Sequence, residues 1–518
     1  MRRSSVSETY RALIVLLVLG FGAWWLARPL AAELLPGAFA LRRGFWFGLT
    51  FIAFALGDFW VFTMLAVGLL IWAQTRDDNA PALFLGLLMV VPSSGLEIPG
   101  FGVVNFLFNL NFPRLLSLVL LLPLFLRLAR QPRTPRDGLS RLPDLLFAGY
   151  FAVEVLLLSR EETVTSAFRG GFYLFVDLFL PYYVFSRAFT DIARIRDAAT
   201  SLVVAGLVLS LVGLFEASRY WLLYASLVQG WGSPEQLLYL DRGSLLRAMG
   251  STGHAIALGY VLAICLLLYL PLYGRLRPGW QRAALFLLLG GGLFSALSRG
   301  PWIGAAAGAL FYVALGPSPV KRLTLLIGGG LAAAVVMSLL PGGGFIIDLL
   351  PFVGTVETGN IDYRQRLMEN AWKLIWLNPL LGSTDYIDRL AAMGMVQGQG
   401  IVDIVNTYVQ VTLRSGLVGL TLFAGVLAAA FLSAMGARKQ AQRAKLEDAE
   451  ILGRSLVAVQ VAVMVIILTV SSIVVIPWLY WCLAGMLVGY ARVVRASVRA
   501  ERAAGPEPRV SRAVRAVR

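Results

Sequence analysis

The stretch that decides the fold class is Ala255-Ile-Ala-Leu-Gly-Tyr-Val-Leu-Ala-Ile-Cys-Leu-Leu-Leu-Tyr-Leu270, an apolar run that contains no charged residue. Similar runs recur along the chain, which is 58% hydrophobic and only 14% charged. Backbone groups inside a bilayer must hydrogen-bond within their own segment, so such runs predict membrane-spanning helices. A membrane barrel would instead show short segments of alternating polarity. We therefore expect an all-α polytopic membrane protein with about 12 to 14 transmembrane helices.

Apolar runs mark the candidate spans, with two alternatives left open in the N-terminal third. Residues 45–72 form either one tilted helix or two short helices split at Gly57 and Asp58, and residues 82–111 suit a broken or re-entrant pair. The first run lacks a small-residue cleavage site, so we interpret it as a retained helix. The candidate spans are residues 13–27, 45–72, 82–92, 115–126, 145–158, 172–185, 202–215, 255–270, 283–297, 302–315, 323–340, 408–432, 456–475 and 478–491.

Basic residues gather in short loops between these spans, a pattern that indicates which loops face the cytoplasm. The net charge of +16 therefore does not indicate a nucleic-acid-binding surface. The loops predicted to be cytoplasmic are residues 127–141, 187–196, 275–282, 321–322 and 438–445, whereas residues 159–171, 217–252 and 342–405 are predicted to lie outside. Arg42 and Arg43 fit this scheme poorly.

The same pattern divides the chain into four parts. Residues 1–341 are transmembrane helices and include the outer loop 217–252, and residues 342–405 form a large outer loop with an amphipathic helix. Residues 406–493 are C-terminal transmembrane helices, and residues 494–518 are a basic cytoplasmic tail.

The large outer loop contains Asp362-Tyr-Arg-Gln-Arg-Leu-Met-Glu-Asn-Ala-Trp372, in which a pattern of apolar residues spaced by three and four begins. This spacing predicts a helix with one apolar face that lies along the membrane surface. Arg364 and Arg366 fall in its first turn. Because residues two apart do not share a helix face, at most one of them points at a given ligand, and we favour Arg364.

Two further arginines lie on the predicted outer side. Arg247 precedes two glycines and His254 at the start of a span, where backbone amides and the helix dipole favour an anion such as a diphosphate. An interfacial arginine beside a capped helix start is the alternative. Arg299 separates two short spans, and an arginine at membrane depth costs about 2.5 kcal/mol or more unless it faces a cavity or an anion. The alternative is that Arg299 extends to the outer interface.

The large loop ends in Asn406-Thr-Tyr408, and the following span contains Arg414-Ser-Gly416, where glycine permits close helix approach. His254 is the single histidine of the chain, and a zinc site needs more ligands than that. No acidic cluster for a divalent ion stands out in the sequence. We therefore expect neither a metal nor another cofactor.

Taken in order, these motifs resemble one superfamily. Arg-x-x-Gly followed by Gly-His, Ser-Arg-Gly, Asp-Tyr-Arg followed by Pro-Leu-Leu-Gly, and Asn-x-Tyr followed by Arg-x-Gly-Leu-Val-Gly-Leu resemble O-antigen ligases and O-antigen or exopolysaccharide polymerases over residues 247–420. The resemblance implies a GT-C-like, metal-independent membrane glycosyltransferase of the bacterial inner membrane, with its active site facing the periplasm. The implied substrate is an undecaprenyl-diphosphate-linked oligosaccharide, and other polysaccharide assembly proteins are candidate partners.

The resemblance also implies roles for single residues. Arg247 and Arg364 would engage the diphosphate as catalytic residues. We predict further substrate-binding roles for His254, Arg299, Arg366, Asn406 and Tyr408.

One departure separates the branches of the superfamily. In the ligase branch the large outer loop ends in His-Asn, and that histidine is held to be catalytic, whereas this chain has Val405-Asn406. The polymerase branch is therefore the better match, and we expect the chain to join lipid-linked repeat units into a cell-surface polysaccharide. The alternatives are a ligase that uses a second acceptor, a lipid-linked oligosaccharide flippase and a non-catalytic scaffold. The general base stays open between Asp362, Glu369, Asp403 and His254.

Overall fold

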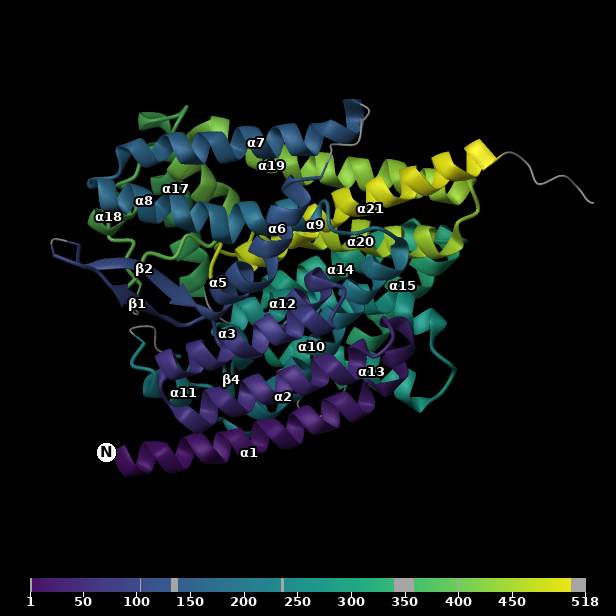
Figure 1. Cartoon of the computed structure of the whole chain (residues 1–518), viewed down its shortest axis with the longest axis horizontal. Helices are drawn as coiled ribbons and strands as arrows, with labels where there is room; N and C mark the ends of the chain where they lie inside the picture. Colours follow the sequence, from purple (N-terminus) through teal and green to yellow (C-terminus); the bar gives the residue numbers. More distant parts are fainter. Residues whose placement is uncertain are drawn as a thin grey trace, which may run out of the picture.

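The computed structural model describes residues 2–102, 104–131, 138–233, 237–339, 358–397 and 400–504. Of these described residues 76% are helical, which confirms the all-α fold class. Nine helices in these ranges are long and apolar enough to cross a membrane, so the protein is a polytopic membrane protein. Most long helices run roughly side by side, with loops and short elements at the two ends of the bundle (Figure 1). The first part of the large loop, residues 342–357, and the tail after residue 504 lie outside the described residues.

Every predicted span overlaps a helix. The elements before residue 192 are α1 (Arg2–Leu26), η1 (Arg28–Glu33), α2 (Ala38–Leu56), α3 (Phe59–Arg76), α4 (Ala80–Leu87), β1 (Gly95–Pro99), β2 (Phe106–Asn111), α5 (Phe112–Leu116), η2 (Ser117–Leu121), α6 (Leu122–Ala129), α7 (Gly138–Leu157), η3 (Leu158–Arg160), α8 (Val164–Tyr173), η4 (Leu174–Phe179) and α9 (Leu180–Phe185). The strands β1 and β2 pair as an antiparallel hairpin.

The second part of the chain contains the two central helices of the bundle, α10 and α12, most of whose residues are buried. Its elements are α10 (Ile192–Arg219), α11 (Ala225–Gly230), β3 (Asp241–Arg242), β4 (Leu245–Leu246), η5 (Gly250–Thr252), α12 (Ala255–Arg275), α13 (Trp280–Ser295), α14 (Arg299–Ala314), α15 (Pro319–Leu339), α17 (Thr358–Leu377), α18 (Tyr386–Ala392), α19 (Thr407–Arg443), α20 (Glu447–Ile466) and α21 (Ile476–Ala504). The strands β3 and β4 form a second antiparallel hairpin.

The two open alternatives of the N-terminal third are decided by helix ends. Residues 45–72 are two helices, because Gly57, with a φ of 63°, ends α2. Asp58 then starts α3 by accepting hydrogen bonds of 2.9 Å from the backbone N–H groups of Trp60 and Val61. Residues 82–111 are broken but are not a pair of helices: α4 ends at Leu87, residues 88–94 are buried but not helical, and the β1–β2 hairpin follows up to residue 111. Such irregular backbone is tolerated within a bilayer only where protein buries it.

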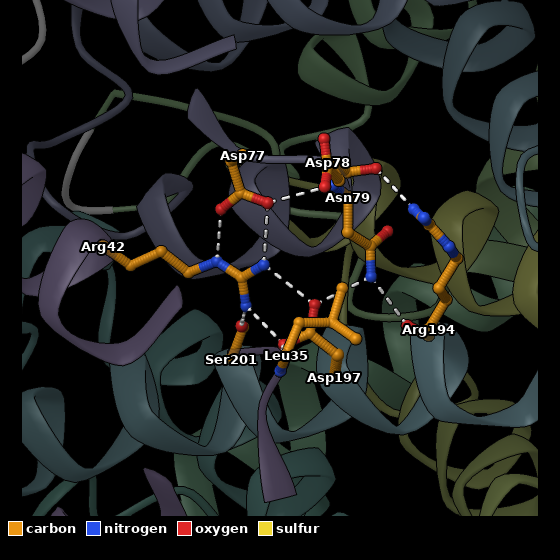
Figure 2. A network of polar contacts seen from close by, with 8 residues as sticks. All are labelled: Leu35, Arg42, Asp77, Asp78, Asn79, Arg194, Asp197 and Ser201. Atoms are coloured by element: carbon orange, nitrogen blue, oxygen red, sulfur yellow. Dashed lines mark hydrogen bonds and ion pairs between the residues drawn. The ribbon is translucent and has the colours of Figure 1, made fainter. Parts of the chain in front are cut away.

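Figure 2 shows a buried polar network around Arg42 of α2. The guanidinium donates hydrogen bonds of 2.7 and 3.0 Å to Asp77 and two of 2.8 Å to Asp197. Asn79 donates at 2.8 Å to Asp197 and to the carbonyl oxygen of Arg194. Arg42 therefore lies at the same end of the bundle as the Arg194 loop. Its poor fit to the predicted topology arose because residues 45–72 were counted as one crossing, and the two-helix split removes it.

Arginine-rich loops meet at one end of the bundle, which we call the basic end. Glu33 pairs with Arg196 at 3.3 Å and with Arg275 at 2.8 Å, and both arginines also pair with Asp448. We call the opposite end, where α11, α17, α18 and the β1–β2 hairpin lie in Figure 1, the site end. It also contains the turn that joins α20 to α21, residues 467–475, named the α20–α21 turn below. That the basic end faces the cytoplasm stays a prediction.

Candidate functional site

The site end contains a cavity of about 200 Å³ between α17 and the start of α19. The cavity brings together Arg364, Val405 and Asn406, three residues on which the sequence-based prediction depends. Arg366 lies two residues further along α17 and is not among the described lining residues, although both arginines are exposed. Among the described residues, the lining consists of Arg364, Leu367, Met368, Ile404, Val405, Asn406, Val409 and Leu468.

Packing beneath α17 fixes the position of Arg364. The buried side of the helix, Leu367, Ala371, Leu374 and Ile375, packs against Tyr386, Leu390, Met395, Ile404 and Leu413. The hydroxyl oxygen of Tyr363 lies 3.1 Å from the carbonyl oxygens of Met395 and Asp403. Half of the predicted apolar face is therefore buried inside the large loop, whereas Met368, Trp372 and Trp376 are exposed.

The Pro-Leu-Leu-Gly turn after α17 packs directly on the Arg-x-Gly motif of α19. The backbone N–H groups of Leu417 and Val418 donate to the carbonyl oxygens of Pro379 and Leu380, at 2.8 and 3.2 Å. Gly416 has a φ of 67° inside α19, and a Cβ there would lie 2.2 Å from the carbonyl atoms of Leu380. Glycine is required here by the close approach of a turn, and not of a second helix as the sequence indicated.

Glu216, at the C-terminal end of α10, anchors the loop that carries Arg247. Its buried carboxylate accepts hydrogen bonds from the backbone N–H groups of Leu223 at 3.0 Å, Met249 at 3.0 Å and Gly250 at 2.8 Å. Two of these donors follow Arg247 by two and three residues, so the carboxylate fixes the path of the loop. Glu216 is not among the residues predicted from the sequence, although a lone glutamate at the end of an apolar run is a usable signal.

His254 is the N-cap residue of α12, where its Nδ1 accepts a hydrogen bond of 3.2 Å from the N–H of Ile256. Burial, together with the positive charge of Arg247, lowers the pKa of His254 to about 4. The imidazole is therefore neutral near pH 7 and carries its proton on Nε2. It offers a hydrogen-bond donor to a ligand, but no positive charge to a diphosphate.

Backbone contacts join the Arg247 loop to the Ser-Arg-Gly sequence. The N–H of Ala248 donates to the carbonyl oxygen of Ser295 at 3.1 Å, and Arg242 of β3 donates to that of Leu297 at 2.5 Å. Helices α13 and α14 have 16 residues each. A helix of that length spans about 24 Å, less than the hydrocarbon core of about 30 Å. We therefore expect Arg299, the first residue of α14, to lie below the outer surface of the bilayer.

The α20–α21 turn contacts the start of α19, the end of the large loop and the start of α14. The Thr407 side chain donates to a carbonyl oxygen of the turn at 2.8 Å, and the hydroxyl of Ser471 donates to the carboxylate of Asp403. Gly300 lies so close that a Cβ there would be 2.3 Å from the Oγ1 of Thr469. The predicted span 456–475 is wrong at its C-terminal end, since α20 stops at residue 466 and the remaining residues form this turn.

Residues 283–424 match the family model described as O-Antigen ligase. The chain is similar to the O-antigen ligase family. The match confirms the resemblance to the O-antigen ligase and polymerase superfamily and supports a membrane glycosyltransferase of this general kind. It runs from α13 into α19, so it includes Arg299, Arg364 and Val405 and leaves out Arg247 and His254. No curated protein matches the chain.

In this O-antigen ligase-like chain, Asn406 and Tyr408 make structural contacts. The Asn406 Oδ1 caps α19 by accepting hydrogen bonds from the N–H groups of Tyr408 at 2.9 Å and Val409 at 3.2 Å. The Tyr408 hydroxyl lies 3.3 Å from the carbonyl oxygen of Met464 in α20. Asn406 thus holds the helix start and lines the cavity, whereas Tyr408 packs between α19 and α20.

The four residues considered as a general base have different surroundings. Asp403 is bound to Ser471, and His254 caps α12. Asp362 and Glu369 are exposed on α17. All four lie outside the described lining of the cavity. Within the part of the chain that the structure describes, no group of three or more histidine, cysteine, aspartate or glutamate residues is placed to hold a metal ion.

Proposed function

We propose that the chain is a polysaccharide polymerase that joins polyprenyl-diphosphate-linked oligosaccharide repeat units at the site end, on the outer side of the membrane. The observation that carries the proposal is the cavity in which Arg364 and Asn406 stand beside Met368 and Val405. A cationic group next to an apolar wall suits the junction between a diphosphate and its lipid. The match to the O-antigen ligase family supports the same class of substrate.

Because a polyprenyl diphosphate is already an activated leaving group, the enzyme mainly has to neutralise the negative charge that develops on it, and no covalent intermediate with the protein is needed. The acceptor hydroxyl oxygen forms the new bond to the anomeric carbon as the bond from that carbon to the diphosphate oxygen breaks. The electron pair of the broken bond stays on the diphosphate, and the hydroxyl proton passes to a base or to water. Arg364 would stabilise the departing charge, with Arg247 as a second cation, since a guanidinium binds phosphate oxygens through two parallel hydrogen bonds.

Val405 favours the polymerase over the ligase. Val405 lines the cavity. By the resemblance it takes the position at which the ligase branch carries its histidine, and a valine can neither accept nor donate a proton. A general base contributes about 10²- to 10⁴-fold to such a reaction, so a ligase without one would be slow. In the polymerase the growing chain's diphosphate would leave, and a fresh lipid-linked unit would supply the acceptor hydroxyl.

Purified protein incubated with a single lipid-linked repeat unit, and with no other acceptor, tests the proposal. We expect products that contain two or more repeats on one lipid. Transfer that occurs only after a non-polyprenyl acceptor such as lipid A is added would instead establish a ligase. Movement of the intact lipid-linked unit across the membrane, with no covalent product, would establish a flippase.

A further inference from the structure

Helix α17 has an exposed apolar flank between its buried and polar sides. Successive residues of an α-helix are turned by about 100°, so residues four apart follow a slowly turning ridge. Met368, Trp372 and Trp376 form such a ridge beside the buried side of the helix, and Leu380 follows in the next turn of chain. Their exposed fractions are 45%, 57%, 60% and 65%. Lys373, next to Trp372 in sequence, falls on the polar side.

The flank has the composition of a membrane interface. The rings of Trp372 and Trp376 meet edge to face with their centroids 5.7 Å apart. Tryptophan is enriched where hydrocarbon meets the headgroups, because its ring is apolar and its N–H needs a polar partner. A soluble loop that exposed two tryptophans, a methionine and a leucine on one ridge would present a contiguous apolar surface to water.

Hydrogen bonds connect the end of this flank to a membrane-spanning helix. The carbonyl oxygen of Leu380 accepts from the N–H of Val418 at 3.2 Å. Leu417 and Val418 are 41% and 36% exposed on α19, a helix long and apolar enough to cross the membrane. Exposed apolar side chains on a spanning helix face lipid, so the flank of α17 is continuous with a lipid-facing surface.

We propose that the flank of Met368, Trp372, Trp376 and Leu380 is inserted into the outer leaflet of the bilayer, so that α17 is an interfacial helix with its polar side in water. The occupant of the flank is bulk phospholipid. Met368 also lines the cavity of Arg364, so insertion would hold that cavity at the level of the lipid headgroups. The inference does not depend on which reaction the cavity catalyses.

Site-directed spin labelling of the full chain in vesicles of phosphatidylethanolamine and phosphatidylglycerol tests the proposal. Cys265 and Cys482 are both buried and can be replaced by serine to give a background for single labels. A nitroxide is attached at Trp372→Cys, with Trp376→Cys as a second position on the flank. The matched control is Lys373→Cys, one residue away on the polar side. Collision rates are measured with oxygen, which concentrates in lipid, and with a nickel chelate present on both sides of the vesicle membrane.

The labels on the flank are expected to collide more with oxygen and less with the nickel chelate than the label at residue 373. Equal access of the nickel chelate at residues 372 and 373 would show the flank in water and overturn the proposal. Low collision rates with both reagents at residue 372 would show a protein partner or a second copy on the flank and overturn it as well. A lipid-like response that appears only after polyprenyl diphosphate is added would assign the flank to the substrate's isoprenoid chain instead of bulk lipid, and would also overturn it.

Discussion

Replacing Glu216 with glutamine probes the anchor of the Arg247 loop with almost no change in side-chain volume. The carboxylate accepts three backbone hydrogen bonds, of which Oε2 takes those from Met249 and Gly250 and Oε1 takes that from Leu223. A glutamine has one acceptor oxygen. If that oxygen keeps the two loop donors, its NH₂ group faces the N–H of Leu223, which then has no acceptor.

The cost follows from these bonds. Leaving the buried N–H of Leu223 without an acceptor costs about 1–3 kcal/mol, and the two hydrogen bonds that remain become weaker because an amide oxygen is a poorer acceptor than a carboxylate. We expect the free energy of local opening of the loop to fall by about 3 kcal/mol, which raises the equilibrium constant for opening about a hundredfold.

Amide hydrogen exchange of the detergent-solubilised protein is the direct assay. Peptides that cover residues 247–253 should exchange up to about a hundredfold faster in Glu216→Gln, while peptides from α17 stay unchanged. Glu161→Gln, an exposed glutamate of another loop at the site end, is the matched control and should leave both regions unchanged. Unchanged exchange of residues 247–253 in Glu216→Gln would refute the assignment of Glu216 as the anchor.

Three further substitutions have defined outcomes. Gly416→Ala should lower the free energy of unfolding by about 3 kcal/mol, because a left-handed φ and a Cβ against Leu380 force the turn off α19 and break two hydrogen bonds; an unchanged melting temperature would contradict this. His254 has a lowered pKa, so its stabilising effect is complete above pH 6.5 and is lost as the pH falls toward about 4. His254→Asn keeps the helix cap without titrating, so its melting curves should depend less on pH in that window; parallel curves would contradict the buried neutral imidazole. Arg42→Met leaves two buried carboxylates without their cation and should cost about 3–5 kcal/mol, whereas Arg43→Met should cost far less.

Much of the membrane architecture could be predicted from the sequence because apolar runs report burial in lipid directly. The spans, the break at Gly57 and the arginine-rich loops are local features of this kind. From the order of the motifs, Arg364, Val405 and Asn406 were singled out as residues of one functional site. These three residues line one cavity. Their roles in binding and catalysis stay predictions.

The tertiary contacts that shape the site end could not be predicted from local sequence patterns. Two serines and a threonine did not break the apolar run 456–475, because a hydroxyl in a helix can bond to a carbonyl oxygen of the preceding turn. The α20–α21 turn was therefore read as helix. Likewise, Gly416 carries a pattern typical of close approach, but the identity of the approaching segment depends on tertiary folding.

The central claim is that Arg364 in the cavity, and not its neighbour Arg366, binds the diphosphate of the lipid-linked substrate. The most direct measurement compares Arg364→Lys with Arg366→Lys, at equal amounts of folded protein, for binding of undecaprenyl diphosphate and for formation of products with two or more repeats. Lysine keeps the charge and loses the paired hydrogen bonds, so we expect Arg364→Lys to lose about 10- to 100-fold in both and Arg366→Lys to stay near wild type. Equal losses in the two variants, or wild-type binding and product lengths in Arg364→Lys, would contradict the account.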